Sequence, residues 1–292
     1  MTPHTLVSPP AIHAGPRTGI AMNLVNGVES DAISVRDRGL MYGDGVFRTF
    51  TLRGGKPLLW RRQYAKLAAD CKALRIACPA AGVFERDLAA IAARFPDCVV
   101  KIVVTRGGGE RGYAIPVAAS PVRVVSASPL PDYPQLHYDR GVRAHLCRIR
   151  LAAQPALAGI KHLNRLENVL ARSEWSDPEI AEGLLCDADG NVICGTMSNV
   201  FLVRGGELAT PDLARCGVAG VQRELVIELA RSNNIPARIA SVSIGELLCA
   251  DELFLVNSVI GVWQITALDR KTWIAGPMTA QIRRWINHAQ RC

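Results

Sequence analysis

The chain has 292 residues, of which 49% are hydrophobic and 21% are charged. This composition is typical of a globular protein and excludes a disordered or fibrous one. The length is sufficient for two domains, because one domain usually takes about 100 to 200 residues. The formal net charge of +8 suits an anionic small ligand, and the basic residues form no long run that would indicate a nucleic-acid partner.

Cysteine usage and hydropathy limit the expected environment. The nine cysteines form neither a C-x-x-C pair nor an even framework, so we expect reduced thiols and no metal site. No apolar run approaches the roughly 18 residues of a membrane span, so no membrane association is expected. Residues 1–21 are rich in proline and lack the pattern of a secretory signal, which predicts a disordered tail on a cytoplasmic protein.

Residues 22–130 are expected to form a smaller N-terminal α/β domain. Short apolar runs flank Asn26-Gly27, which is a strong hairpin signal, and two further strands are expected around Gly54-Gly55. Apolar residues then recur at helical spacing. The later elements expected in this domain are helices over 61–77 and 84–95 and strands over 98–105 and 122–128.

A connection between domains is expected at 131–141, within the proline-rich and aperiodic sequence PLPDYPQLHYDRG. Residues 142–292 would then form a larger C-terminal domain in which strands alternate with helices. The expected strands are 142–149, 183–187, 191–194, 199–203 and 252–258, and the expected helices are 163–175, 221–233 and 277–288.

A single lysine stands out in GIKHLNRLENVLARSEW (159–175), between a Gly-Ile pair and an amphipathic helical pattern. Most lysines at such junctions are solvated surface residues. A lysine whose surroundings lower its pKa is instead a nucleophile toward carbonyl groups, which is typical of enzymes that use pyridoxal 5'-phosphate (PLP). Lys161 is therefore a catalytic candidate if the chain also offers a phosphate site.

A candidate phosphate site lies in CGVAGVQRELVIELA (216–230), where small residues lead directly into a periodic helix. Unpaired backbone N–H groups at Val221 and Gln222, together with the helix dipole, would bind a phosphate there. The same pattern also fits an ordinary loop entering a helix, so these residues alone do not decide between the two interpretations.

Five motifs together resemble the fold type IV PLP enzymes, a family that includes branched-chain and D-amino-acid aminotransferases and 4-amino-4-deoxychorismate lyases. The resemblance covers about residues 22–265 and implies an α/β (α+β) fold of two domains with the cofactor in the cleft between them. RGGGERGY combined with GIKHLNRLE is more similar to the lyases than to either aminotransferase group. The five motifs are GLMYGDGVFRT (39–49), RGGGERGY (106–113), GIKHLNRLENVLA (159–171), DADGNVICGTMSNVF (187–201) and GVAGVQRE (217–224).

The resemblance implies roles for several residues. Lys161 would bond covalently to the PLP aldehyde and, when released by substrate, act as general acid and base. Val221 and Gln222 would donate N–H groups to the phosphate, with Ser258 beside them. Lys66 stands where the family commonly has a phosphate-binding arginine. An arginine guanidinium can donate two parallel hydrogen bonds to a phosphate, whereas the lysine ammonium group is a single compact charge.

Cys194 is a sharper departure, because the family has a glutamate five residues before the asparagine of S-N-x-F. That carboxylate keeps the pyridine nitrogen protonated, whereas a thiol is uncharged near neutral pH at its usual pKa. We therefore expect Cys194 to weaken the cofactor as an electron sink and to favour elimination over transamination. Buried cysteines are also common in strands for packing reasons alone.

A substrate with two carboxylates needs guanidinium groups or oriented N–H donors. Arg106, Arg111 and Tyr113 of the glycine-rich motif are the expected substrate-binding residues, although arginines are more often surface charges. Arg48, where the aminotransferases typically have glutamate, is a further candidate. His162 is expected to support its neighbours, because adjacent helical residues point in different directions.

The expected reaction converts 4-amino-4-deoxychorismate to 4-aminobenzoate and pyruvate, a step toward folate. The alternatives are a D-amino-acid or branched-chain aminotransferase and a catalytically silent binding protein of the same fold, which residues 48, 66 and 194 suggest. A nucleic-acid binder is the weakest alternative. The resemblance also implies a homodimer that shares loops between its sites, and a functional link to aminodeoxychorismate synthase is a further expectation.

Overall fold

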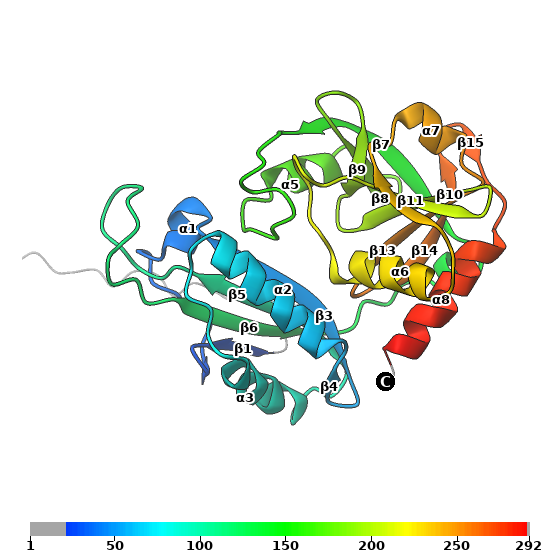
Figure 1. Cartoon of the computed structure of the whole chain (residues 1–292). Coiled ribbons are helices and arrows are strands. Elements are labelled where there is room, and N and C mark those ends of the chain that lie inside the picture. Colours follow the sequence, from blue (N-terminus) through cyan, green and yellow to red (C-terminus); the bar gives the residue numbers. More distant parts are fainter. Residues whose placement is uncertain (1–21, 291–292) are drawn as a thin grey trace, which may run out of the picture.

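The computed structural model describes residues 22–290 and contains two β-sheets (Figure 1). The tail expected at 1–21 lies outside the described residues. The first sheet has six strands in the order β2-β1-β6-β5-β3-β4, and all neighbouring strands in it are antiparallel. No helix within 22–290 is both long and apolar enough to cross a membrane.

The first sheet and its helices come from one continuous part of the chain. The side chains of α2 and α3 pack on the sheet around fully buried Phe50 and Phe84. The elements are β1 (Met22–Val25), β2 (Val28–Glu29), α1 (Arg38–Tyr42), β3 (Gly45–Arg53), β4 (Lys56–Pro57), α2 (Trp60–Ala73), α3 (Ala81–Ala92), β5 (Cys98–Thr105) and β6 (Val122–Ser128).

The second sheet has nine strands, in the order β12-β11-β10-β13-β14-β7-β8-β9 with β15 paired to β14. The elements are α4 (Leu136–Asp139), β7 (Val142–Leu151), α5 (Leu166–Arg172), β8 (Ile180–Asp187), β9 (Val192–Gly195), β10 (Asn199–Arg204), β11 (Glu207–Pro211), α6 (Val221–Ser232), β12 (Ala237–Ala240), α7 (Ile244–Leu248), β13 (Glu252–Asn257), β14 (Gly261–Leu268), β15 (Lys271–Thr272) and α8 (Pro277–Ala289). Helices α6 and α8 pack together on one face of this sheet, over Phe201 and Phe254 (Figure 1).

Several expected elements are confirmed with their bounds, including the strands 98–105 and 122–128 and the hairpin at Asn26-Gly27. The helix expected over 163–175 is shorter, since α5 begins only at Leu166. Strand β14 was not expected, although it joins β13 to β7 in the middle of the sheet. Its sequence GVWQITAL follows β13 after only three residues, which made the two difficult to separate from sequence.

A glycine at the start of β3 permits close approach of the segment that carries Lys161. A Cβ on Gly45 would lie 2.7 Å from both Val104 O and Leu163 Cδ1, which is too close for real Cβ contacts. Gly82 lies inside α3, and a Cβ there would meet nothing within 4 Å.

We predict that Gly45→Ala lowers the free energy of unfolding by about 1 to 3 kcal/mol, the usual cost of overpacking. Gly82→Ala is the matched control and should raise it by about 0.5 to 1 kcal/mol, because alanine favours the helix. Urea denaturation of both variants measures the two effects. Equal stability of Gly45→Ala and the unsubstituted protein would contradict the close approach.

Candidate active site

Lys161 lies on an extended segment that attaches to the edge of β3. Phe47 N donates to Lys161 O at 2.9 Å, and Leu163 N donates to Gly45 O at 3.0 Å. An antiparallel bridge joins Val46 and His162. This pairing with β3 holds residues 161–163 in an extended conformation, so the helix expected from 163 cannot begin there.

The Lys161 amine is enclosed between the two parts of the molecule. Its Nζ lies 4.6 Å from the centroid of the Phe47 ring. Burial lowers the pKa of Lys161 to about 8, and repulsion from the Arg48 and Arg165 guanidinium groups acts in the same direction. Far more of this amine is therefore neutral near pH 7 than for an exposed lysine, as a nucleophile or base requires.

A cavity of about 380 Å³ opens at this amine. Six of the residues singled out in the sequence line it together: Arg48, Lys161, Cys194, Val221, Gln222 and Ser258. Its lining also contains Arg165 but no aspartate or glutamate. Cationic side chains without a lining carboxylate favour an anionic ligand.

One wall of the cavity is the N-terminus of α6. No side chain caps this helix, whose N-cap is Gly220. A Cβ on Gly220 would lie 2.3 Å from Asn199 Oδ1, and instead Gly220 N donates to that oxygen at 3.1 Å. The side-chain amide of Gln222 is buried, and neither its nitrogen nor its oxygen has a protein partner. These features fit a phosphate group, which accepts N–H donors at a helix N-terminus.

Ser258 borders the same wall, whereas Lys66 does not line the cavity. The Ser258 hydroxyl accepts a hydrogen bond from Gln63 Nε2 at 2.9 Å. Lys66 Nζ donates to the Asp70 carboxylate and, at 3.0 Å, to Gly159 O. The contacts of Lys66 in this chain therefore hold the segment before Lys161 and do not present its ammonium group to the cavity.

Asp70 is the acceptor at which the site residues meet, and the sequence reasoning missed it. Its carboxylate is 2% exposed and accepts from Arg48 Nη1 at 3.4 Å and from Lys161 N at 3.3 Å, besides Lys66. Burial lowers the pKa of Arg48, and attraction to Asp70 opposes that shift. Arg48 Nε is buried and has no hydrogen-bond partner within the described residues. The sequence contains one indication of this contact, because residues four apart on a helix, such as Lys66 and Asp70, lie side by side.

Cys194 lies on β9 at the cavity wall as an uncharged thiol. Burial raises its pKa to about 12, and the neighbouring Glu182 carboxylate adds to the effect. Arg165, a lining residue that was not anticipated, donates to His162 O at 3.1 Å and also contacts the ring of His162. Burial and the Arg165 charge lower the pKa of His162 to about 4, so this histidine is neutral and supports Arg165.

The substrate-binding roles expected for the glycine-rich motif are not met within one chain. Arg106 is 4% exposed, bonds to Asp44 at 2.8 and 3.0 Å, and donates to two backbone carbonyls. This guanidinium holds the end of α2 and does not line the cavity of this chain, so its substrate-binding role stays a prediction. Arg111 and Tyr113 are exposed outside the cavity, and Tyr113 is 86% exposed.

The model of the amino-transferase class IV family matches residues 45–268, which include Lys161 and all six lining residues named above. The chain belongs to this family. The fold is accordingly the fold type IV architecture that the sequence predicted. Within the matched range, Lys161 is enclosed in the cavity. Cys194 on β9 lines the same cavity, at the position where the resemblance leads one to expect a glutamate.

The relatives of this class IV chain include lyases and aminotransferases. The crystal structure of 4-amino-4-deoxychorismate lyase from Pseudomonas aeruginosa is 48% identical, with a TM-score of 0.88 over 91% of this chain and 98% of that one. Aminodeoxychorismate lyase of Vibrio harveyi is 33% identical over 84% of this chain and 90% of its own. A putative branched-chain-amino-acid aminotransferase of Methanocaldococcus jannaschii is 31% identical over 82% of this chain and 84% of its own.

The lowered pKa predicts how Lys161 reacts with pH. In protein stripped of any bound aldehyde, reductive methylation of Lys161 should accelerate as the pH rises through about 8 and level off above it, because the neutral amine reacts. A lysine in an unstructured reference peptide, whose pKa is about 10.4, should continue to accelerate well beyond that pH. Mass spectrometry of both peptides measures the rates. Parallel pH profiles for the two lysines would contradict the lowered pKa.

Proposed function

We propose that the cavity binds PLP and that Lys161 attaches it covalently. One observation carries the proposal: a single cavity contains an enclosed amine and an uncapped helix N-terminus, and its lining has no carboxylate. Bound there, PLP supplies an electron sink for breaking bonds to the carbon that bears the substrate amino group. The N–H groups of Val221 and Gln222 bind the phosphate, and Ser258 lies beside them.

The reaction proposed is the conversion of 4-amino-4-deoxychorismate to 4-aminobenzoate and pyruvate, toward folate. The amine of Lys161 accepts the proton that leaves C4 of the substrate ring and protonates the enolpyruvyl group as it departs from C3. Its pKa near neutrality suits both transfers. Aromatisation of the ring drives the elimination, and the two lyase relatives support this choice of substrate.

The substrate carboxylates are assigned to the two arginines that line the cavity. Arg48 lines the cavity, and Asp70 fixes its position through Nη1. Arg165 is held by His162, which is neutral and therefore does not repel it. Each guanidinium can donate two parallel hydrogen bonds to a carboxylate, which a lysine cannot.

Cys194 favours elimination over transamination in this proposal. A buried neutral thiol donates weakly and contributes no negative charge, so it does not hold a proton on the nitrogen of a bound pyridine ring. Transamination requires the substrate carbanion to persist until the cofactor is protonated, whereas elimination does not. The aminotransferase alternative, which relatives such as the M. jannaschii protein suggest, therefore fits this chain less well.

A catalytically silent binding protein remains the second alternative, and residues 48, 66 and 194 favour it. It would bind PLP without releasing pyruvate. One assay distinguishes the two functions in protein whose absorption spectrum shows bound cofactor. Formation of product supports the lyase, and absence of product supports the silent protein.

We propose further that the protein is a cytoplasmic homodimer with a domain boundary at 131–141. Helix α5 exposes Leu166, Val169 and Leu170 by 75%, 61% and 56%, and a second copy would cover this apolar face. The partner's glycine-rich loop could then bring Arg111 and Tyr113 to the site. A link to aminodeoxychorismate synthase follows only from the proposed substrate.

Replacing the amine tests the lyase. With 4-amino-4-deoxychorismate as substrate, Lys161→Ala should lose at least about 10²- to 10⁴-fold of the rate, the usual contribution of a general acid and base. Lys72→Ala removes an exposed amine from α2 and should retain full activity. Pyruvate and 4-aminobenzoate are both measured. Unchanged pyruvate release by Lys161→Ala would show that the assignment of roles is wrong.

Restoring the family's carboxylate tests the role of Cys194. We predict that Cys194→Glu shifts the absorption of bound PLP to longer wavelength, because the carboxylate stabilises a protonated ring nitrogen. The variant should also gain amino transfer from D-amino or branched-chain amino acids to 2-oxoglutarate. Cys194→Ser keeps a neutral side chain and should show neither change. A Cys194→Glu protein that is only a better lyase would contradict the idea.

A further inference from the structure

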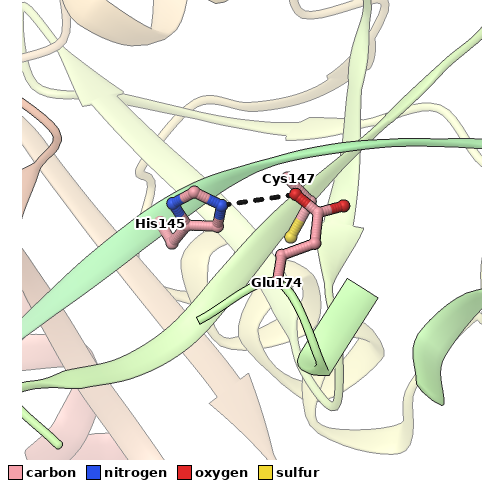
Figure 2. A group of neighbouring side chains, drawn as sticks. All are labelled: His145, Cys147 and Glu174. Atoms are coloured by element: carbon pink, nitrogen blue, oxygen red, sulfur yellow. Dashed lines mark hydrogen bonds and ion pairs between the residues drawn. The ribbon is translucent and has the colours of Figure 1, made fainter. Parts of the chain in front are cut away.

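Three potential metal ligands converge beside β7, outside the cavity lining. His145 and Cys147 lie two residues apart on β7, so both side chains are on the same face of the sheet. Glu174 approaches them from the segment after α5 (Figure 2). One nitrogen, one sulfur and one carboxylate oxygen of the three residues all lie within 4.8 Å of one another. None of the three lines the cavity.

The distance between His145 and Glu174, a long hydrogen bond in this structure, also fits two ligands of one metal ion. His145 Nε2 and Glu174 Oε2 are 3.4 Å apart, beyond the usual range of about 2.7 to 3.2 Å for an N–H···O bond. Two ligands bound tetrahedrally to Zn²⁺ at about 2.05 Å are separated by about 3.3 Å. The observed separation is close to this value; Figure 2 draws the present hydrogen bond between the two side chains as a dashed line.

The groups around the cluster hold the ligands in place. Glu174 accepts hydrogen bonds from Arg148 N at 2.7 Å and from Ile149 N at 2.9 Å. The other ring nitrogen of His145 lies 3.9 Å from the Asp269 carboxylate. Metal-binding histidines usually have such a carboxylate behind them, and metal-binding carboxylates are usually hydrogen-bonded themselves. Hydrogen bonds therefore hold Glu174 in place, and the Asp269 carboxylate lies near His145 without a hydrogen bond to it.

The sulfur of Cys147 occupies a space that a glycine leaves open. A Cβ on Gly183 would lie 2.6 Å from Cys147 Sγ and 2.7 Å from the Trp175 ring. The Arg148 guanidinium lies 3.5 Å from Glu174, but its side chain is 86% exposed and can turn to solvent. Arg150 Nη1 is held by the Cys147 carbonyl oxygen at 2.8 Å. His145 is partly exposed, which provides a path for an ion and a water ligand.

We propose that His145, Cys147 and Glu174 bind Zn²⁺ or a similar thiophilic divalent metal, with water as fourth ligand. Imidazole and thiolate together select such metals over Mg²⁺ or Ca²⁺. The ion would join β7 to the segment between α5 and β8, and so stabilise the connection that follows the Lys161 segment. No sequence motif indicates this site, since a ligand 27 residues after Cys147 matches no compact metal motif.

Cobalt titration of untagged, chelator-treated holoprotein tests the site, because Co²⁺ reports its geometry. Difference spectra should show one Co²⁺ per chain, with intense visible bands of four-coordinate geometry and a near-ultraviolet thiolate charge-transfer band. Zn²⁺ should displace the Co²⁺ and raise the midpoint of thermal unfolding. Weak six-coordinate bands, or no binding at one equivalent, would overturn the proposal and leave His145 and Glu174 as an ion pair.

Variants separate this site from other thiols. His145→Phe keeps a ring against Trp175 and should weaken Co²⁺ binding at least tenfold, with the same result for Cys147→Ala. Cys249→Ala removes an exposed thiol and should leave the spectrum unchanged. If Cys147→Ala fails to fold, His145→Phe decides alone. A charge-transfer band that survives in His145→Phe, or one lost in Cys249→Ala, would place the metal elsewhere.

Discussion

The pairing of the Lys161 segment with the edge of β3 is the interaction on which the site depends. Two main-chain hydrogen bonds to Gly45 and Phe47 attach the lysine segment to the first sheet. The Asp70 carboxylate fixes the same segment from α2 through the Lys161 N–H. Because this attachment encloses the amine, it also lowers the pKa on which the chemistry relies.

Burying several cations in one cavity is unfavourable without a compensating anion. Asp70 compensates part of the charge of Arg48 and Lys66 from behind the cavity wall. No carboxylate of the lining compensates the positive charge that remains at Arg48, Arg165 and Lys161. An anionic cofactor and a substrate with two carboxylates would supply the missing charge, so the electrostatics and the proposed function agree.

Sequence patterns predicted the parts of the fold that depend on local periodicity. The apolar runs of β5 and β6 and the helical spacing of α6 were sufficient, because each element buries its own apolar residues. Family motifs identified Lys161, Cys194, Val221 and Gln222, all of which line the cavity. Local patterns failed where pairing with a distant segment determines the backbone conformation. The clearest case is the segment before Leu166, which pairs with the edge of β3 and is not helical.

Side-chain partners were also beyond the reach of sequence patterns. Arg106 was expected at the substrate, but Asp44 and the carbonyls at the end of α2 engage its guanidinium. Asp70 lies outside the five motifs and reaches the site only through the packing of α2. Arg165 lies within GIKHLNRLENVLA, but the motif alone does not show its contacts with His162. Such roles depend on which elements meet in space.

The central claim is that the Lys161 amine reaches and bonds to the aldehyde of PLP. Borohydride reduction of the protein with PLP, followed by peptide mapping, tests it directly, because reduction makes the carbon–nitrogen bond permanent. The account predicts one phosphopyridoxyl group per chain, on the peptide that contains Lys161. Labelling of other lysines with an unmodified Lys161 peptide would contradict it.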